Sequence, residues 1–192
     1  SEEDIDKALY LIEQYNFTSW DEPYLNTKGQ FVNTYNKYIK KYKLWLEQGC
    51  CCMYTGKVIN LKNLFDDNYS DMEHTIPRSL SFDNSDSNLT VCDSYYNRHI
   101  KKNRIPTQLE NYNEDICIGG ISYSAIKPRL RKWEERVKHL EDMVNLWKRK
   151  SATASTKEFK DFCIVNKHKW QMELDYWRNK LDRFTRTDVP EG

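Results

Sequence analysis

Three stretches of the chain repeat large apolar side chains at helical spacing. The first begins near Thr34 and repeats Tyr35, Tyr38, Ile39, Tyr42, Trp45 and Leu46. The other two step by three and four residues, as in a heptad repeat: Leu130, Trp133, Val137, Leu140, Val144 and Trp147, then Trp170, Leu174, Trp177, Leu181 and Phe184. Because a short polar segment joins these two, they predict long helices packed as an antiparallel hairpin. The pattern Ser155-x-x-Glu158 predicts a capping box where the second helix begins.

Short strands and turns are predicted between the first helix and the hairpin. Tyr69 to His74 predicts one strand, and Leu89 to Cys92 predicts a second. Asp93 or Ser94 can cap the helix that follows. Together these elements predict a compact ββα unit.

The remaining segments are predicted to connect these elements. Residues 1–33 are predicted to be an acidic helical or linker segment, because the first 22 residues hold seven carboxylates and one lysine. Residues 111–123 resemble a linker, with Gly119-Gly120 as a candidate hinge. The predicted fold is therefore α+β: a small ββα core with its leading helix at 34–110, then a linker and the helical hairpin at 111–192.

Overall composition narrows the function little. Lys and Arg number 30 against 29 Asp and Glu, so the net charge of +1 neither favours nor excludes a nucleic-acid partner. No apolar run approaches the roughly 20 residues of a membrane span, so we expect no membrane partner. The six cysteines show neither a disulfide framework nor a CxxC pair, which favours free thiols in a reducing compartment over a zinc site. The first helix also carries lysines that could contact a phosphate backbone but are interpreted as a solvated face: Lys37, Lys40, Lys41 and Lys43.

Candidate chemistry lies in the first predicted strand and on the capped helix. The strand carries Asp71, Glu73 and His74, and the helix carries Asn97. A neutral imidazole suits the deprotonation of water near neutral pH. Carboxylate and amide oxygens suit Mg²⁺, which keeps most of its waters and takes few protein ligands. We therefore assign His74 as the general base of a metal-dependent nuclease, Glu73 and Asn97 as metal ligands, and Asp71 as a second candidate carboxylate.

Strand geometry leaves an alternative open. Residues in a strand alternate between faces, so Asp71 and Glu73 would share one face and His74 would lie on the other. All three line one site only if the strand twists or ends there. Otherwise the histidine and carboxylate form a structural hydrogen-bonded pair, as in a non-catalytic helical adaptor.

Basic residues surround this cluster and are candidates for phosphate contacts. They are Arg78, Arg98, Lys101 and Arg104. Contacts of this kind position a nucleic-acid backbone but carry no sequence information.

Longer motifs around these residues resemble the HNH nuclease family, whose ββα-metal fold places a histidine at a strand end and an asparagine on the helix. The segments 52–57, 71–85 and 97–106 resemble, in detail, the HNH domain of the type II CRISPR effector nucleases (the Cas nine family). Residues 41–45, 176–178 and 183–185 resemble the segments that join this domain to a split RuvC-like domain.

The resemblance assigns roles to particular residues. His74 matches the family's general base and Asn97 its amide ligand. Glu73 stands where many members carry Asp, and its extra methylene changes the reach to a metal. Asn88 matches a loop asparagine that gives structural support.

The resemblance also implies a function. It implies Mg²⁺-dependent cleavage, with Mn²⁺ able to substitute, of the DNA strand paired to a guide RNA, in the cytoplasm of a bacterium. The partners would be the guide RNA–DNA heteroduplex and, through the full-length effector, the guide RNA and the RuvC-like domain. A stand-alone HNH endonuclease of the homing or restriction type is the alternative among enzymes.

Overall fold

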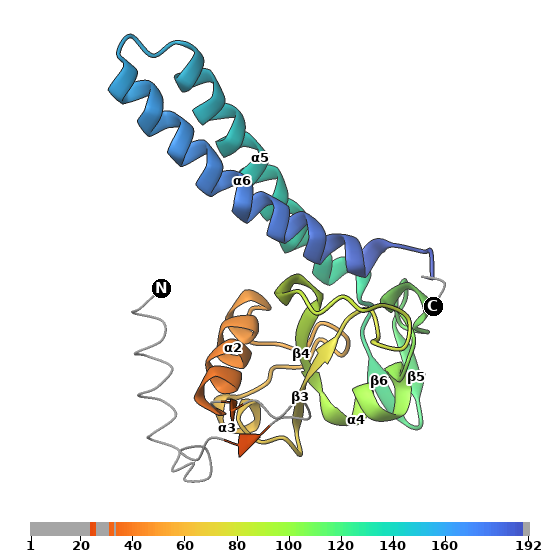
Figure 1. Cartoon of the computed structure of the whole chain (residues 1–192). Coiled ribbons are helices and arrows are strands. Elements are labelled where there is room, and N and C mark those ends of the chain that lie inside the picture. Colours follow the sequence, from red (N-terminus) through yellow and green to blue (C-terminus); the bar gives the residue numbers. More distant parts are fainter. Residues whose placement is uncertain (1–23, 26–30, 33, 190–192) are drawn as a thin grey trace.

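A small core of short strands and helices carries a long two-helix arm in this chain (Figure 1). The computed structural model describes residues 24–25, 31–32 and 34–189, so the acidic helix predicted in segment 1–22 lies outside the described residues. Within the described part, no helix is long and apolar enough to cross a membrane.

The elements follow one another in short succession. In chain order they are β1 (Tyr24–Leu25), β2 (Phe31–Val32), α2 (Thr34–Glu47), α3 (Leu61–Leu64), β3 (Ser70–His74), η2 (Asp86–Asn88), β4 (Leu89–Asp93), α4 (Ser94–Tyr96), η3 (Asn97–Lys101), η4 (Pro106–Gln108), β5 (Ile116–Ile118), β6 (Ile121–Tyr123), η5 (Lys127–Leu130), α5 (Arg131–Ala152) and α6 (Lys157–Thr185). The strands form three two-stranded antiparallel sheets, β1–β2, β3–β4 and β5–β6.

The ββα unit predicted from the sequence is present. Strand β3 pairs with β4 so that Glu73 lies opposite Thr90. The Asp93 side chain caps α4 by accepting a hydrogen bond from the Tyr96 amide at 2.8 Å. Helix α4 then continues into η3, a single π-helical turn that carries Asn97. The α+β fold is confirmed.

The antiparallel hairpin of α5 and α6 is also confirmed. Its two apolar seams face each other, and the Trp133 ring packs edge-on against Trp177 and Phe184, at centroid distances of 5.6 and 5.3 Å. The expected capping box from Ser155 to Glu158 is not formed: the N-cap is Thr156, whose hydroxyl accepts from the Phe159 amide, and a phenylalanine at that position cannot complete a capping box.

Helix α2 buries Tyr38 and Tyr42, as periodicity predicted, but other positions differ from the prediction. Leu44 is buried, whereas Leu46 is 43% exposed. Lys41, assigned to a solvated face, is completely buried and donates to the Ser70 carbonyl at 2.9 Å and to Asp67 at 3.3 Å. Burial lowers the pKa of Lys41, and the nearby Asp67 carboxylate opposes that shift. The long lysine side chain thus joins α2 to the start of β3.

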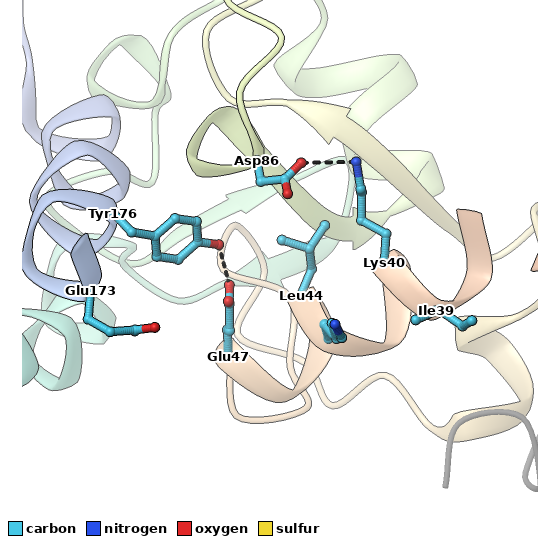
Figure 2. Close-up of a pocket in the computed structure, with 8 residues that line it drawn as sticks. Ile39, Lys40, Leu44, Glu47, Asp86, Glu173 and Tyr176 are labelled. Atoms are coloured by element: carbon cyan, nitrogen blue, oxygen red, sulfur yellow. Dashed lines mark hydrogen bonds and ion pairs between the residues drawn. The ribbon is translucent and has the colours of Figure 1, made fainter. Parts of the chain in front are cut away.

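The base of the arm is joined to α2 by buried polar contacts. Figure 2 shows the Tyr176 hydroxyl of α6 reaching Glu47 of α2, at 2.7 Å, beside a hollow. The fully buried Lys180 ammonium donates to the same carboxylate at 3.0 Å and to the Leu89 carbonyl at 3.1 Å. These bonds hold the arm against the strand that pairs with β3. None of the candidate site residues lines the hollow.

The linker predicted at 111–123 is instead packed structure. Strands β5 and β6 form a hairpin whose two-residue turn is Gly119-Gly120, both with positive φ. The Asn111 side chain is fully buried and donates to the Tyr54 carbonyl at 2.8 Å. The candidate hinge is therefore the tip of a β-hairpin, because glycine is favoured there by the turn geometry.

A tight turn at 52–57 delivers Tyr54 to the inside of the ββα unit. Gly56 adopts φ +73°, and a Cβ at this position would lie 2.5 Å from the Arg129 guanidinium. That guanidinium is held by the carbonyls of Met53 and Tyr54, both at 2.9 Å. Glycine is thus needed both for the backbone conformation and for the close approach.

Candidate active site

Strand β3 presents two carboxylates to the helical segment that follows β4. Asp71 contacts Asn97, and Glu73 contacts Lys101, four residues further along the helical segment. Alternation in the strand places Asp71 and Glu73 on the same face, as the sequence predicted. The helical segment therefore supplies partners to both carboxylates.

The Asp71 carboxylate is held by three side chains of the helical segment. The Asn97 amide donates to Oδ2 at 2.9 Å, and the Ser94 hydroxyl donates to Oδ1 at 3.2 Å. Arg98 binds both oxygens, through Nε at 3.1 Å and an Nη atom at 2.7 Å. The Asp71 side chain is 15% exposed and that of Arg98 is 53% exposed, so this cluster borders solvent.

The Glu73 carboxylate is enclosed, with only 6% of its side chain exposed. It accepts from the Tyr54 hydroxyl at 2.6 Å and from the Thr90 hydroxyl, and it pairs with the Lys101 ammonium at 3.1 Å. Burial and the Glu73 charge raise the pKa of Tyr54 well above its usual range, so the phenol stays a donor. Lys101 also donates to the His74 carbonyl at 3.1 Å, which ties the end of β3 to the helical segment.

The His74 imidazole lies at the end of β3 and contacts Arg78, whose Nε is 3.4 Å from Nε2. Burial and the Arg78 charge lower the pKa of His74, while a hydrogen bond with Asn84 and the carboxylates of Glu73 and Asp83 act in the opposite direction. The net shift favours the neutral imidazole near pH 7, which is the form that accepts a proton.

Asn88 organises the loop that follows His74. Its side chain is fully buried, accepts from the Ile76 amide at 2.9 Å and donates to the carbonyls of Ile76 and Asp83, at 3.1 and 2.9 Å. These bonds hold the chain that carries Arg78 against β4.

The basic residues near the site differ in whether their side chains are free to contact a nucleic-acid backbone. Arg78 and Arg98 are exposed, and Arg104 is paired with Glu110 at 2.7 Å. Lys101 was expected to contact phosphate, but its side chain is 1% exposed and engaged with Glu73. That expectation is corrected, because an ammonium enclosed by its own fold cannot reach a nucleic-acid backbone.

Two residues that hold Glu73 were not predicted. Tyr54 lies 19 residues before Glu73 in the chain and Thr90 lies 17 after it. Thr90 is identifiable once the register of β3 and β4 is known, since it lies directly opposite Glu73. No pattern in the sequence pointed to Tyr54.

The donor set fits a hard divalent cation. Asp71 offers carboxylate oxygens, and rotation of the Asn97 amide by half a turn brings its oxygen to the side where its nitrogen now lies. Within the described residues no cluster of three or more His, Cys, Asp or Glu side chains surrounds a common point. A pair of oxygen ligands suits Mg²⁺, which keeps several waters, better than it suits zinc. The six cysteines, all in the described part, form no disulfide.

Comparisons with known proteins agree with this geometry. Residues 52–107, which contain β3, β4 and the helical segment, match the family model of the HNH endonucleases. Over 126 residues the chain is 28% identical to the CRISPR-associated endonuclease Cas9 1 of Streptococcus thermophilus, which covers 60% of this chain. Residues 52–107 are therefore similar to the HNH endonucleases, and the chain is similar to Cas9 over the aligned region.

The chain corresponds to a small part of the relatives to which it is similar. The matched region spans 11% of the curated Cas9 relative. Among solved structures, Streptococcus thermophilus Cas9 in complex with the AGAA PAM covers 97% of this chain at 16% identity, with a TM-score of 0.48 and 22% of its own chain covered. The same organism's Cas9 with the GGAA PAM covers 98% at 18% identity, with a TM-score of 0.46 and 17% covered. The resemblance to type II CRISPR effector nucleases is confirmed.

Proposed function

We propose that the domain hydrolyses the DNA strand that is paired to a guide RNA, as part of a full-length Cas9-type effector. The observation that carries the proposal is a histidine at the end of β3 with its pKa lowered, three residues after the Asp71 that contacts Asn97, all inside the HNH-matched segment. In RNA-guided effectors the sequence is read by base pairing, so the nuclease domain itself needs no base-reading surface.

His74 acts as the general base in this proposal. Its neutral imidazole takes a proton from the attacking water, and this role requires a pKa at or below the working pH. Burial and Arg78 supply that shift. The bond from Lys101 to the His74 carbonyl fixes the backbone that carries the imidazole.

A divalent cation, Mg²⁺ or in its place Mn²⁺, would neutralise charge on the scissile phosphate when bound. We propose Asp71 and Asn97 as the residues that first hold it, because these two side chains are in contact and border solvent. Glu73, which the sequence predicted as a metal ligand, reaches a cation only if it releases Lys101, since that ammonium already neutralises it.

The partners in this proposal are nucleic acids and other parts of the effector. The guide RNA–DNA heteroduplex is the substrate, and Arg78, Arg98 and Arg104 are the candidate phosphate contacts. The arm α5–α6 would lead toward the RuvC-like domain of the full-length protein.

A strand-resolved cleavage assay tests the function. We expect the full-length effector, loaded with guide RNA, to cut the guide-paired strand in Mg²⁺ or Mn²⁺ and to leave it intact in excess EDTA. Each DNA strand would carry its own label. Cutting without guide RNA would favour a stand-alone HNH endonuclease, and an intact guide-paired strand together with no metal binding would favour the non-catalytic adaptor.

The dependence of cutting on pH tests the role of His74. Activity should be full above the His74 pKa and fall as the pH drops through it, because only the neutral imidazole accepts a proton. Arg78 contributes to the lowered pKa, so in Arg78→Gln the fall should begin at a higher pH. The midpoint of the acid limb is the measurement, since the maximal rate also reports any lost phosphate contact.

Arg104→Gln is the matched control for the pH experiment. It removes the same charge from an arginine that pairs with Glu110, away from the imidazole. An acid limb that stays in place in Arg78→Gln would contradict the assignment of His74 as the titrating base.

A further inference from the structure

We propose that Arg98 is a latch on the metal site, which holds Asp71 when no metal is bound and exchanges that carboxylate for a substrate phosphate. This inference rests on the proposed nuclease function and adds a coupling between metal binding and substrate binding.

The contacts of Arg98 occupy both oxygens of Asp71. The guanidinium donates to Oδ2 through Nε and to Oδ1 through an Nη atom, and the same Nη donates to the Asp67 carbonyl at 2.9 Å. Paired, parallel hydrogen bonds of this type are among the stronger interactions of a carboxylate. A cation that binds Asp71 must therefore displace Arg98 or share the carboxylate with a positive charge.

Exposure shows which of the two carboxylate–cation pairs can open. Glu73 and Lys101 are 6% and 1% exposed, so separating them would leave a buried charge without a partner. Arg98 is 53% exposed, and water can replace its bonds as it leaves. The exchange therefore takes place at Asp71, and the pair of Glu73 and Lys101 stays closed beneath it.

A phosphodiester is the natural alternative partner for the released guanidinium. Its two non-bridging oxygens match the guanidinium fork as a carboxylate does. A substrate that draws Arg98 to its backbone leaves Asp71 free for the cation. Because such coupling is reciprocal, substrate should raise metal affinity and metal should raise substrate affinity.

Metal affinity in the absence of DNA tests the latch directly. Mn²⁺ binding to the 192-residue chain would be followed by electron paramagnetic resonance of the free ion. We expect Arg98→Ala and Arg98→Gln to bind Mn²⁺ at least about 5-fold more tightly than the wild type, the lower end of typical coupling between sites. Arg98→Lys, which keeps the charge but loses the fork, should fall between.

Arg104→Ala is the matched control, because it removes an equal charge and an exposed ion pair nearby in the chain. Equal tightening in Arg104→Ala would mean a general charge effect and would overturn the latch. Unchanged or weaker Mn²⁺ binding in both Arg98 variants would also overturn it. If neither the wild type nor the Arg98 variants bind Mn²⁺, the proposed metal site itself fails, and that outcome is distinct from failure of the latch alone.

Dimethyl phosphate, the smallest phosphodiester, tests the exchange. It should tighten Mn²⁺ binding in the wild type and leave Arg98→Ala unchanged, because that variant has no guanidinium to withdraw. Equal tightening in both proteins would contradict the exchange and assign the effect to phosphate bound directly to the ion.

Discussion

Replacing His74 with alanine is expected to lower the rate of guide-paired strand cutting by about 10²–10⁴-fold, the usual contribution of a general base. The loss is expected because His74 lies at the end of β3, contacts Arg78 and has a lowered pKa. No other described side chain combines these three features. Single-turnover cleavage by the full-length effector gives the rate, and filter binding of the guided complex to target DNA should remain unchanged.

His99→Ala is the control for this substitution. His99 lies on the same helical segment as Asn97, is exposed, and packs against the Tyr95 ring at 4.6 Å. Cutting should continue at the wild-type rate in this variant. A His74→Ala protein that still cuts the guide-paired strand normally would remove His74 from the mechanism.

Replacing Lys101 with methionine is expected to lower the free energy of unfolding by about 3–5 kcal/mol, the range found when one partner of a buried ion pair is removed. The substitution leaves the Glu73 carboxylate enclosed with two hydroxyl donors and no positive charge. It also removes the bond to the His74 carbonyl. Urea denaturation of the chain, followed by circular dichroism, gives the change in stability.

Two further variants separate the ion pair from the side chain itself. Lys138→Met makes the same change at an exposed position of α5 and should alter stability by less than about 0.5 kcal/mol. Adding Glu73→Gln to Lys101→Met should recover part of the loss, because the buried charge is then removed. A Lys101→Met protein as stable as Lys138→Met would show that the Glu73–Lys101 ion pair contributes nothing measurable to the free energy of unfolding.

The two carboxylates on β3 differ in how far they and their partners are exposed to solvent. Glu73 and Lys101 are buried and hold β3 against the helical segment, whereas Asp71, Asn97 and Arg98 border solvent. A single strand therefore carries a structural carboxylate and an accessible one, two residues apart on the same face. Burial, rather than residue type, distinguishes them.

Residue patterns along the sequence predicted the elements that are stabilised by contacts between residues close together in the chain. The heptad spacing from Leu130 to Phe184 was enough to predict α5 and α6, because facing apolar seams have few other ways to be buried. The helix that Asp93 caps was predicted for the same local reason. Helix α2 was harder to predict, because Lys41 and Leu46 exchange the environments expected of them once α2 packs against β4 and Lys41 reaches the start of β3. The glycines at 119–120 suggested a linker, and only the pairing of β5 with β6 shows a turn.

The sequence by itself determined the types of residue at the site and their order: His74 with two carboxylates before it, and an asparagine on a capped helix after the next strand. The spacing of residues in the chain is sufficient to place these residues on a strand and a helix, since the periods of strands and helices are local properties. The tertiary structure alone decided which carboxylate is enclosed by Tyr54, Thr90 and Lys101 and which one meets Asn97 and Arg98. That choice depends on burial and on partners from distant segments, and no linear pattern encodes either.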